Sequence, residues 1–246
     1  MQRKPPQISY LLLFPPAASP KAIKLVKYPY RDFHPHGIDL LQPGNRTLLY
    51  VINHRREGEV IELFELALQA EPATATFVES IEDPLFRNLN DVVVLSPNEF
   101  YTTNWLRYEP GTLNNLYETV LQKPLSYVVH CRRATAKDAF HCHVAAENLG
   151  VCVIAENTHG LQSLAPSLAS RDSPASDTAQ PPCAGQMANS LAYDATKQKL
   201  YVTASVAKTI HEFTPMKNGT LRLDATYDTN RQGCVLGGQN LLLWSL

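Results

Sequence analysis

Short apolar runs separated by turn-forming residues make up most of the pattern along the chain. Residues 47–54 and 60–67 are two such runs, and the charged turn Arg55-Arg56-Glu57-Gly58 separates them. Two apolar runs joined by a short turn predict a pair of antiparallel strands. The same reasoning predicts further strands at residues 74–79, 91–95, 100–103, 126–131, 140–145, 189–193, 200–204 and 209–213.

One helix is expected among these strands, over residues 113–121. Leu113, Leu116, Tyr117 and Val120 occupy positions i, i+3, i+4 and i+7, which lie on one face of a helix. The strands around it follow one another in hairpins, with roughly 40 to 45 residues for each group of four, as in the blades of a β-propeller. A β-sandwich shares many of these signals, so the pattern alone predicts an all-β fold without choosing between the two architectures.

The pattern divides the chain into an N-terminal segment and one interrupted domain. Residues 1–32 are rich in proline and weakly patterned, so neither a long helix nor a central strand is expected there. Residues 33–246 form the expected domain, and all-β folds of this length commonly form a single domain. Residues 163–182 are rich in serine, alanine, proline and aspartate, the composition of a flexible loop. We therefore expect a disordered insertion at residues 150–183.

Composition and charge exclude several classes of function. The formal net charge is −1, and the 22 basic and 23 acidic residues form no long runs, so we expect no nucleic-acid partner. The apolar run from Tyr10 to Phe14 is too short for a convincing signal peptide and far too short for a transmembrane segment. The sequence therefore assigns no compartment. It also contains no Gly-x-Ser-x-Gly elbow, P-loop or dinucleotide-binding fingerprint.

The cysteines predict neither a disulfide framework nor a zinc ribbon, because they are odd in number and lack CxxC spacing. At most one or two bridges are expected among Cys131, Cys142, Cys152, Cys183 and Cys234. His141 and His143 place two imidazoles on one face of a predicted strand, at a spacing that can bind zinc. No clear distal ligands accompany them, so an exposed strand face is the preferred interpretation.

Polar residues crowd the start of one strongly apolar run. Asn88, Asn90 and Asp91 directly precede or begin the run at residues 92–95. Polar groups beside a buried strand are costly unless they form hydrogen bonds or bind a cation. Amide and carboxylate oxygens are hard ligands that suit Ca²⁺. The alternative is a turn in which asparagine and aspartate side chains cap the backbone.

Further polar segments beside predicted strands occur in a characteristic order. With Pro84-Leu85-Phe86-Arg87-Asn88-Leu89-Asn90-Asp91, these segments are Phe33-His34-Pro35-His36-Gly37-Ile38, Val51-Ile52-Asn53-His54, Phe100-Tyr101-Thr102-Thr103-Asn104 and Gln186-Met187-Ala188-Asn189. From Phe33 to Phe213, with one interruption, the chain resembles the serum paraoxonase/arylesterase family, in a fungal-type form. The resemblance implies a six-bladed β-propeller and a calcium-dependent hydrolase whose substrate is a small-molecule aryl ester or lactone.

The resemblance also implies two calcium ions. Asn90 and Asn189 match ligands of the catalytic ion, whereas Asp91 and the backbone carbonyl of Ile38 match ligands of a second, structural ion. Neutral amide oxygens hold Ca²⁺ without cancelling its charge, so the ion can polarise an ester carbonyl and stabilise the developing oxyanion.

Two histidines match the catalytic groups of that family. His36 matches its general base, and His54 matches the histidine that supports the base as a dyad. A histidine with a pKa near neutrality can take a proton from water, while a second histidine fixes its tautomer. The alternative for each residue is a strand-end histidine that hydrogen bonds hold in place.

The chain departs from the family pattern in three places. The family draws an acidic pair from an early segment, but Asp32 is the only acidic residue among residues 1–32. Trp105-Leu106 replaces the usual Asp-His, and Tyr227-Asp228-Thr229-Asn230-Arg231 is a poor copy of a later Asp-Asn pair. The chain is also short for six blades, so we expect about four blades in a relative truncated at both ends. The alternative function is a non-catalytic partial propeller that acts as a binding module or has no activity.

Overall fold

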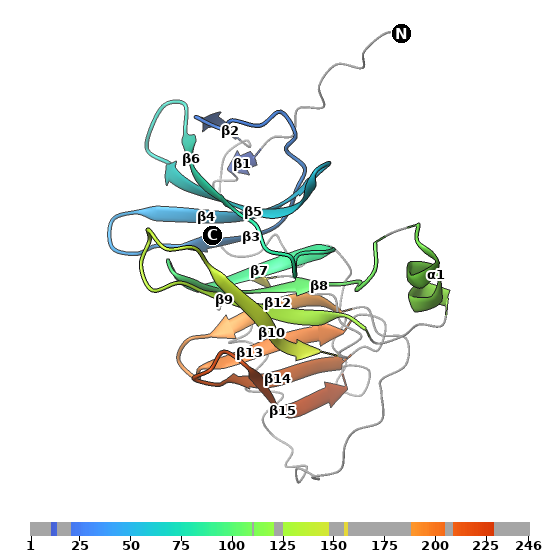
Figure 1. Cartoon of the computed structure of the whole chain (residues 1–246). Helices are drawn as coiled ribbons and strands as arrows, with labels where there is room; N and C mark the ends of the chain where they lie inside the picture. Colours follow the sequence, from blue (N-terminus) through green and yellow to red (C-terminus); the bar gives the residue numbers. More distant parts are fainter. Residues whose placement is uncertain are drawn as a thin grey trace, which may run out of the picture.

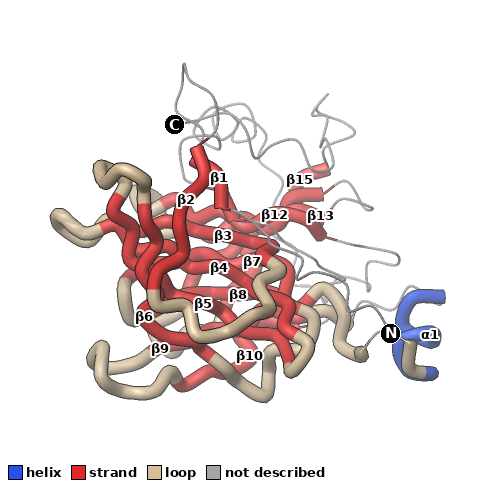
Figure 2. Tube along the Cα trace, turned by 90° about the horizontal axis from the view of Figure 1, so that it is seen from above, coloured by secondary structure: helices blue, strands red, loops and turns tan. Residues whose placement is uncertain are grey.

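Three successive sheets make up the part of the chain that the structure describes (Figure 1). The computed structural model describes residues 11–13, 21–109, 111–120, 125–147, 155–156, 188–204 and 209–228. Within these ranges, strands form nearly all the regular structure and one helix is present (Figure 2). The fold is all-β, as the sequence predicts.

The first sheet has six strands in the order β1-β2-β6-β5-β4-β3. They are β1 (Leu11–Leu13), β2 (Lys21–Val26), β3 (Pro35–Leu41), β4 (Thr47–Arg55), β5 (Gly58–Ala67) and β6 (Thr74–Ile81). β4 and β5 pair along their length, from Thr47 opposite Leu66 to Arg55 opposite Gly58. This pairing confirms the first hairpin expected from the sequence.

The proline-rich N-terminal segment contributes a paired strand to this sheet, which the sequence did not predict. β2 pairs antiparallel with β1 on one side and parallel with β6 on the other. Lys21–Val26 contains no proline, so every residue of the strand keeps its N–H donor. Ile23 is buried whereas Ala22 and Lys24 are exposed, which is the alternation of a half-buried strand. Residues 1–32 therefore hold more regular structure than expected.

The second sheet has four strands in the order β10-β9-β8-β7, and the third has five in the order β11-β12-β13-β14-β15. The second sheet consists of β7 (Leu89–Ser96), β8 (Glu99–Asn104), β9 (Tyr127–Arg132) and β10 (His141–Glu147). The third consists of β11 (Ala155–Glu156), β12 (Ala188–Asp194), β13 (Lys199–Ala204), β14 (Thr209–Pro215) and β15 (Leu221–Asp228). The strands expected in these two sheets are confirmed, while β11 and β15 are additional, as are β1, β2 and β3 in the first sheet.

The second sheet is buried on both faces because the other two sheets pack against it. Val92 and Val94 of β7 belong to the core shared with the first sheet, and Val93 belongs to the core shared with the third. Successive side chains of a strand point to opposite faces, so a strand covered on both sides is apolar throughout. Sheets packed face to face in chain order are the blades of a propeller. The described residues thus form three blades of an incomplete propeller, where about four were expected.

The expected insertion at residues 150–183 lies almost wholly outside the described residues. The exception is Ala155–Glu156, which forms β11 and pairs in parallel with β12, with Ala155 opposite Leu191. β11 also contacts β3 and β7. The disorder expected for this segment remains a prediction.

Helix α1 (Leu113–Val120) confirms the expected helix and stands apart from the sheets (Figures 1 and 2). Its apolar positions are exposed, with 85% of Leu113 and 67% of Val120 accessible. The polar side of the helix makes the contact instead, because the buried Glu118 carboxylate accepts the N–H groups of Arg107 and Tyr108 at 2.9 and 3.1 Å. Within the described ranges, no helix combines the length and apolarity needed to cross a membrane.

A disulfide links Cys131 of β9 to Cys142 of the outer strand β10, where the two residues lie opposite each other. This bridge agrees with the expectation of at most one or two, and the other three cysteines lie outside the described residues. Beside it, the His143 ring packs against His130 with 5.1 Å between centroids, whereas His141 is exposed. The described part of the chain contains no group of three His, Cys, Asp or Glu side chains that could hold a metal ion, so the zinc interpretation gains no support.

Removing this disulfide is expected to lower the free energy of unfolding by about 2–3 kcal/mol, because the bridge closes a short loop in the unfolded chain. The measurement is urea unfolding of the wild type and of the double variant Cys131→Ala/Cys142→Ala, each with and without a reducing agent. The reducing agent should destabilise the wild type and leave the double variant unchanged. Equal stability of the two oxidised proteins would contradict the expectation.

Candidate functional site

Most of the predicted site residues meet where β3, the end strand of the first sheet, contacts β7, the end strand of the second. At this contact, the backbone of Gly37 lies directly against Asn90 and Asp91 of β7. A Cβ atom on Gly37 would lie 2.4 Å from Asp91 Oδ1 and 2.5 Å from the Asn90 carbonyl oxygen. Only a glycine permits such an approach without displacing a neighbour. His36 and Ile38 flank Gly37, so both lie at the same contact.

His36 and His54 form a pair beside Asn90. Their rings are 5.1 Å apart between centroids, with 63° between the ring planes. His36 is exposed at the surface, and neighbouring protein atoms partly desolvate its imidazole. This desolvation, followed by the proximity of His54, lowers the pKa of His36, while a hydrogen bond with Asn90 and the charge of Glu59 act in the opposite direction. The structure therefore brings together two predicted catalytic residues and one predicted calcium ligand.

Glu59 is a fourth member of this group that the sequence analysis missed. It lies opposite His54 in the β4–β5 hairpin, and its Oε2 atom is 2.6 Å from His54 Nδ1. The same oxygen accepts the N–H of Leu89 at 3.2 Å, which ties the carboxylate to β7. The predicted hairpin contained the necessary signal, since the register of its turn places residues 54 and 59 opposite each other.

A buried polar network supports the ends of β3 and β4 next to the histidine pair. The Asn53 Oδ1 atom accepts the His34 N–H at 2.6 Å, and the Asn53 amide donates to Glu62 at 3.0 Å. Glu62 is fully buried and also accepts hydrogen bonds from Arg55, at 2.5 and 2.9 Å, and from Tyr28, at 2.9 Å. The negative charge of Glu62 is thus compensated, and the network fixes the backbone before His36 and at His54.

The polar residues just before β7 and at its start have two different roles. Asn88 caps the backbone, since its amide donates to the carbonyl groups of Leu106 and Tyr108 at 3.3 and 3.1 Å. Asn104 accepts the N–H groups of Arg87 and Asn88 at 2.7 and 3.0 Å. For Asn88, the structure agrees with the alternative interpretation of a capped turn.

Asn90 and Asp91 take the second role and face β3. Both are buried, Asp91 completely, and the Asp91 Oδ1 atom accepts the N–H of Val92 at 2.8 Å. The Asp91 backbone carbonyl accepts the Thr102 hydroxyl at 2.7 Å. The Asp91 carboxylate and the Asn90 backbone carbonyl thus lie beside the β3 backbone at Gly37.

Asp39, two residues after Gly37, links β3 to β7 by a hydrogen bond. Its Oδ2 atom accepts the N–H of Val94 on β7 at 2.7 Å, and its Oδ1 atom accepts the N–H of Leu40 at 2.8 Å. Burial raises the pKa of Asp39 to about 6, and these two hydrogen bonds act against that rise.

Asn189 lies on the third sheet, and the structure describes its backbone alone. It belongs to β12, at a shift in register between Ala188 and Ser190, and β12 contacts β7. The Asn189 side chain is outside the described residues. The expectation that Asn90 and Asn189 share one ion therefore remains a prediction.

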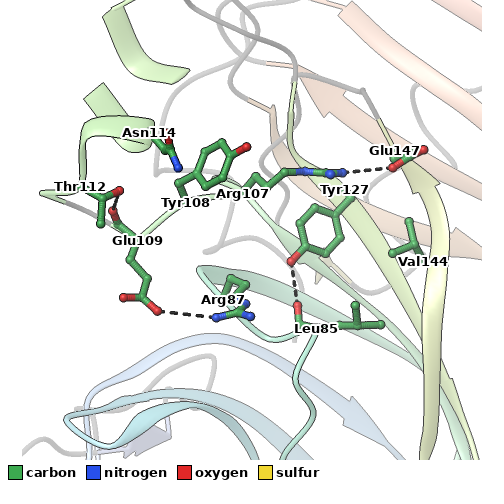
Figure 3. Close-up of a pocket in the computed structure, with 10 residues that line it drawn as sticks. All are labelled: Leu85, Arg87, Arg107, Tyr108, Glu109, Thr112, Asn114, Tyr127, Val144 and Glu147. Carbon is green, nitrogen blue, oxygen red and sulfur yellow. Dashed lines mark hydrogen bonds and ion pairs between the residues drawn. The ribbon is translucent and has the colours of Figure 1, made fainter. Parts of the chain in front are cut away.

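A cavity of about 500 Å³ opens beside the start of β7 (Figure 3). Its two arginines are both engaged, since Arg107 lies 3.1 Å from Glu147 and Arg87 lies 3.6 Å from Glu109. The Tyr127 hydroxyl donates to the Leu85 carbonyl at 2.9 Å. The Asn88 bond to Tyr108, another lining residue, connects this cavity to the polar residues before β7.

Comparison with known proteins gives a match over the same region. Residues 16–148 match the family described as Arylesterase, and they make up more than half of the chain. The chain belongs to the arylesterase family. The region that matches this arylesterase family includes His36, His54, Asn90, Asp91 and Ile38, whereas Asn189 lies beyond it.

Individual arylesterase relatives are similar over shorter stretches. The chain is 31% identical to human serum paraoxonase/lactonase 3 over 98 residues, which is 39% of this chain and 27% of that protein. It is 33% identical to human serum paraoxonase/arylesterase 1 over 105 residues, or 42% of this chain and 29% of that protein. The chain is 34% identical to mechanosensory abnormality protein 6 of Caenorhabditis elegans over 86 residues, which is 34% of this chain and 22% of that protein. The chain thus spans less than a third of the length of these relatives.

Proposed function

We propose that this chain carries part of the catalytic site of a calcium-dependent hydrolase of aryl esters or lactones. The observation that carries the proposal is the meeting of His36, His54 and Asn90 where β3 contacts β7. Membership of the arylesterase family, and the words lactonase and arylesterase in the names of its relatives, support hydrolysis of an ester bond as the reaction class.

The donor set at this contact fits Ca²⁺. Asn90 and Asp91 would supply an amide and a carboxylate, and Ile38, next to the close approach at Gly37, would supply its backbone carbonyl. All of these donors are oxygen atoms, which Ca²⁺ prefers. Asn90 and Asn189 would hold the catalytic ion, and Asp91 with the Ile38 carbonyl would hold the second. Bound Ca²⁺ would polarise the carbonyl group of the substrate.

The histidines would handle the proton of the attacking water. The lowered pKa of His36 favours its neutral ring, in which a ring nitrogen can accept that proton. His36 is exposed to solvent, which gives water and a small substrate access. His54, packed at 5.1 Å, would hold the orientation of the His36 ring.

Hydrolysis of phenyl acetate or a small lactone should require both calcium and Asn90. We expect activity to fall by at least about a hundredfold when EGTA removes Ca²⁺ and when Asn90 is replaced by alanine, since each change removes the electrophile that stabilises the oxyanion. Asn45→Ala is the matched control, because Asn45 lies on the exposed β3–β4 turn, and it should retain full activity. Undiminished activity in EGTA would rule out this mechanism.

Calcium binding can be measured separately from activity. A ligand that binds the folded state stabilises it, by about 2.7 kcal/mol at a hundred times its dissociation constant. Ca²⁺ should therefore raise the melting temperature of the wild type and of Asn45→Ala, and raise that of Asn90→Ala less. If Ca²⁺ changes none of the melting temperatures, the chain is the non-catalytic relative of the alternative hypothesis.

A further inference from the structure

We propose that Glu59 is a positioning residue, which fixes the tautomer of His54 and thereby completes a chain of three side chains, Glu59, His54 and His36. Its significance for hydrolysis rests on the proposed function, whereas the tautomer is a property of the folded chain alone. The sequence resemblance supplied the two histidines without this carboxylate.

The geometry holds the Glu59 carboxylate in one orientation. Its Oε2 atom lies 2.6 Å from His54 Nδ1 and accepts the Leu89 N–H at 3.2 Å. These two donors come from different strands, β4 and β7, so the position of the carboxylate is fixed from both sides. Only 18% of the Glu59 side chain and 33% of the His54 side chain are accessible, which limits the competition from water.

The His54 backbone is fixed as well. Its N–H donates to the His34 carbonyl at 3.2 Å, so the residue is tied to the segment that leads directly to His36. The pairing of β4 with β5 places His54 opposite Glu59. Hydrogen bonds therefore hold both the backbone and the side chain of His54.

The chemistry of the contact selects one tautomer. An ionised carboxylate only accepts hydrogen bonds, so the short contact requires the hydrogen on His54 Nδ1. In the neutral ring, Nε2 is then unprotonated and serves as the acceptor. A neutral histidine in water favours the opposite tautomer, with the hydrogen on Nε2. Glu59 thus imposes a tautomer of His54 that the free side chain does not prefer. The histidine beside His36 then has its hydrogen-bond donor at Nδ1 and its acceptor at Nε2.

Nitrogen NMR of the histidine rings tests the tautomer directly, in the calcium-free chain and without substrate. Long-range ¹H–¹⁵N spectra of the wild type should show His54 protonated at Nδ1 and bare at Nε2. In Glu59→Ala, the ring should change to the Nε2-protonated form. Glu59→Gln should give a mixture, because its side-chain oxygen can still accept the Nδ1–H while its NH₂ group can donate to a bare Nδ1. It also retains an acceptor for the Leu89 N–H, so it serves as the variant that preserves folding.

Glu57→Gln is the matched control, since Glu57 lies in the same hairpin with an exposed side chain. It should leave both the spectrum and hydrolysis unchanged. In the calcium-loaded protein, Glu59→Ala should lower kcat by about tenfold to a hundredfold with little change in KM, as expected when a supporting hydrogen bond is lost.

The outcomes separate this inference from the proposed function. A wild-type His54 protonated at Nε2, or an unchanged tautomer in Glu59→Ala, would overturn the role of Glu59. The expected tautomers, in a protein that hydrolyses no ester under any condition, would support the positioning role and count against the proposed function. A fall in kcat without any change in tautomer would assign Glu59 a merely structural role and overturn the inference.

Discussion

Replacing Gly37 with alanine is expected to abolish calcium-induced stabilisation and ester hydrolysis together. The added Cβ would lie 2.4 Å from Asp91 Oδ1 and 2.5 Å from the Asn90 carbonyl oxygen, and both belong to a buried strand that cannot move independently of its neighbours. β3 and β7 must therefore separate, which moves the Ile38 carbonyl away from the Asn90–Asp91 pair. Overpacking of this kind costs roughly 1–3 kcal/mol in unfolding free energy.

Urea unfolding with and without Ca²⁺ measures both effects. Gly44→Ala is the control, because a Cβ there meets no atom within 4 Å, although its φ of 68° makes alanine somewhat strained. The control should lose some stability and keep its full response to Ca²⁺. If Gly37→Ala responds to Ca²⁺ like the wild type, the calcium ligands do not lie at the β3–β7 contact.

The second large effect is expected from Glu62→Ala, which should lower the free energy of unfolding by about 3–5 kcal/mol. Glu62 is fully buried, and its loss would leave the Arg55 guanidinium, 5% exposed, without its closest carboxylate partner. Tyr28 and Asn53 would each lose a hydrogen bond to the same carboxylate. The measurement is urea unfolding at neutral pH.

Glu65→Ala is the matched control for this prediction. Glu65 lies on the same strand and pairs with Arg46 at 2.9 Å, but both side chains are exposed, by 41% and 52%. Such an exposed pair contributes little to stability, because water and salt screen it. Similar losses in the two variants would show that the network around Glu62 is no more important than a surface ion pair.

The hairpins were predictable from the sequence because their signals are local. β4, β5, β7 and β8 combine apolar runs with short polar turns, and the structure places all four within about two residues of the expected bounds. β3 was not among the predicted strands, because glycine, proline and a buried aspartate interrupt its apolar pattern. Its pairing with β4 and its contact with β7 supply the stability that local preference does not.

In the candidate site, too, some residues could be predicted from local motifs, whereas others could be found only from contacts between distant parts of the chain. The motif order was enough to select His36, His54, Asn90, Asp91 and Ile38, which the structure brings to one contact. Glu59 depended on the register of a hairpin, and the Glu62 network depended on the packing of Tyr28 against β4 and β5. Single residues of these kinds carry no distinctive sequence pattern, so contacts in space were needed to find them.

Because both faces of β7 are buried, its pairing register with the neighbouring strand must be set in an unusual way. A half-buried strand resists slippage because a shift by one residue would turn its apolar side chains into water. Val92, Val93 and Val94 have no such safeguard, since apolar cores cover both faces. Alignment must come from polar contacts, of which the Asp39 bond to the Val94 N–H and the Asn104 bonds to the Arg87 and Asn88 N–H groups are the clearest. The residues around the candidate site would then also guard the chain against mispaired, aggregation-prone folding intermediates.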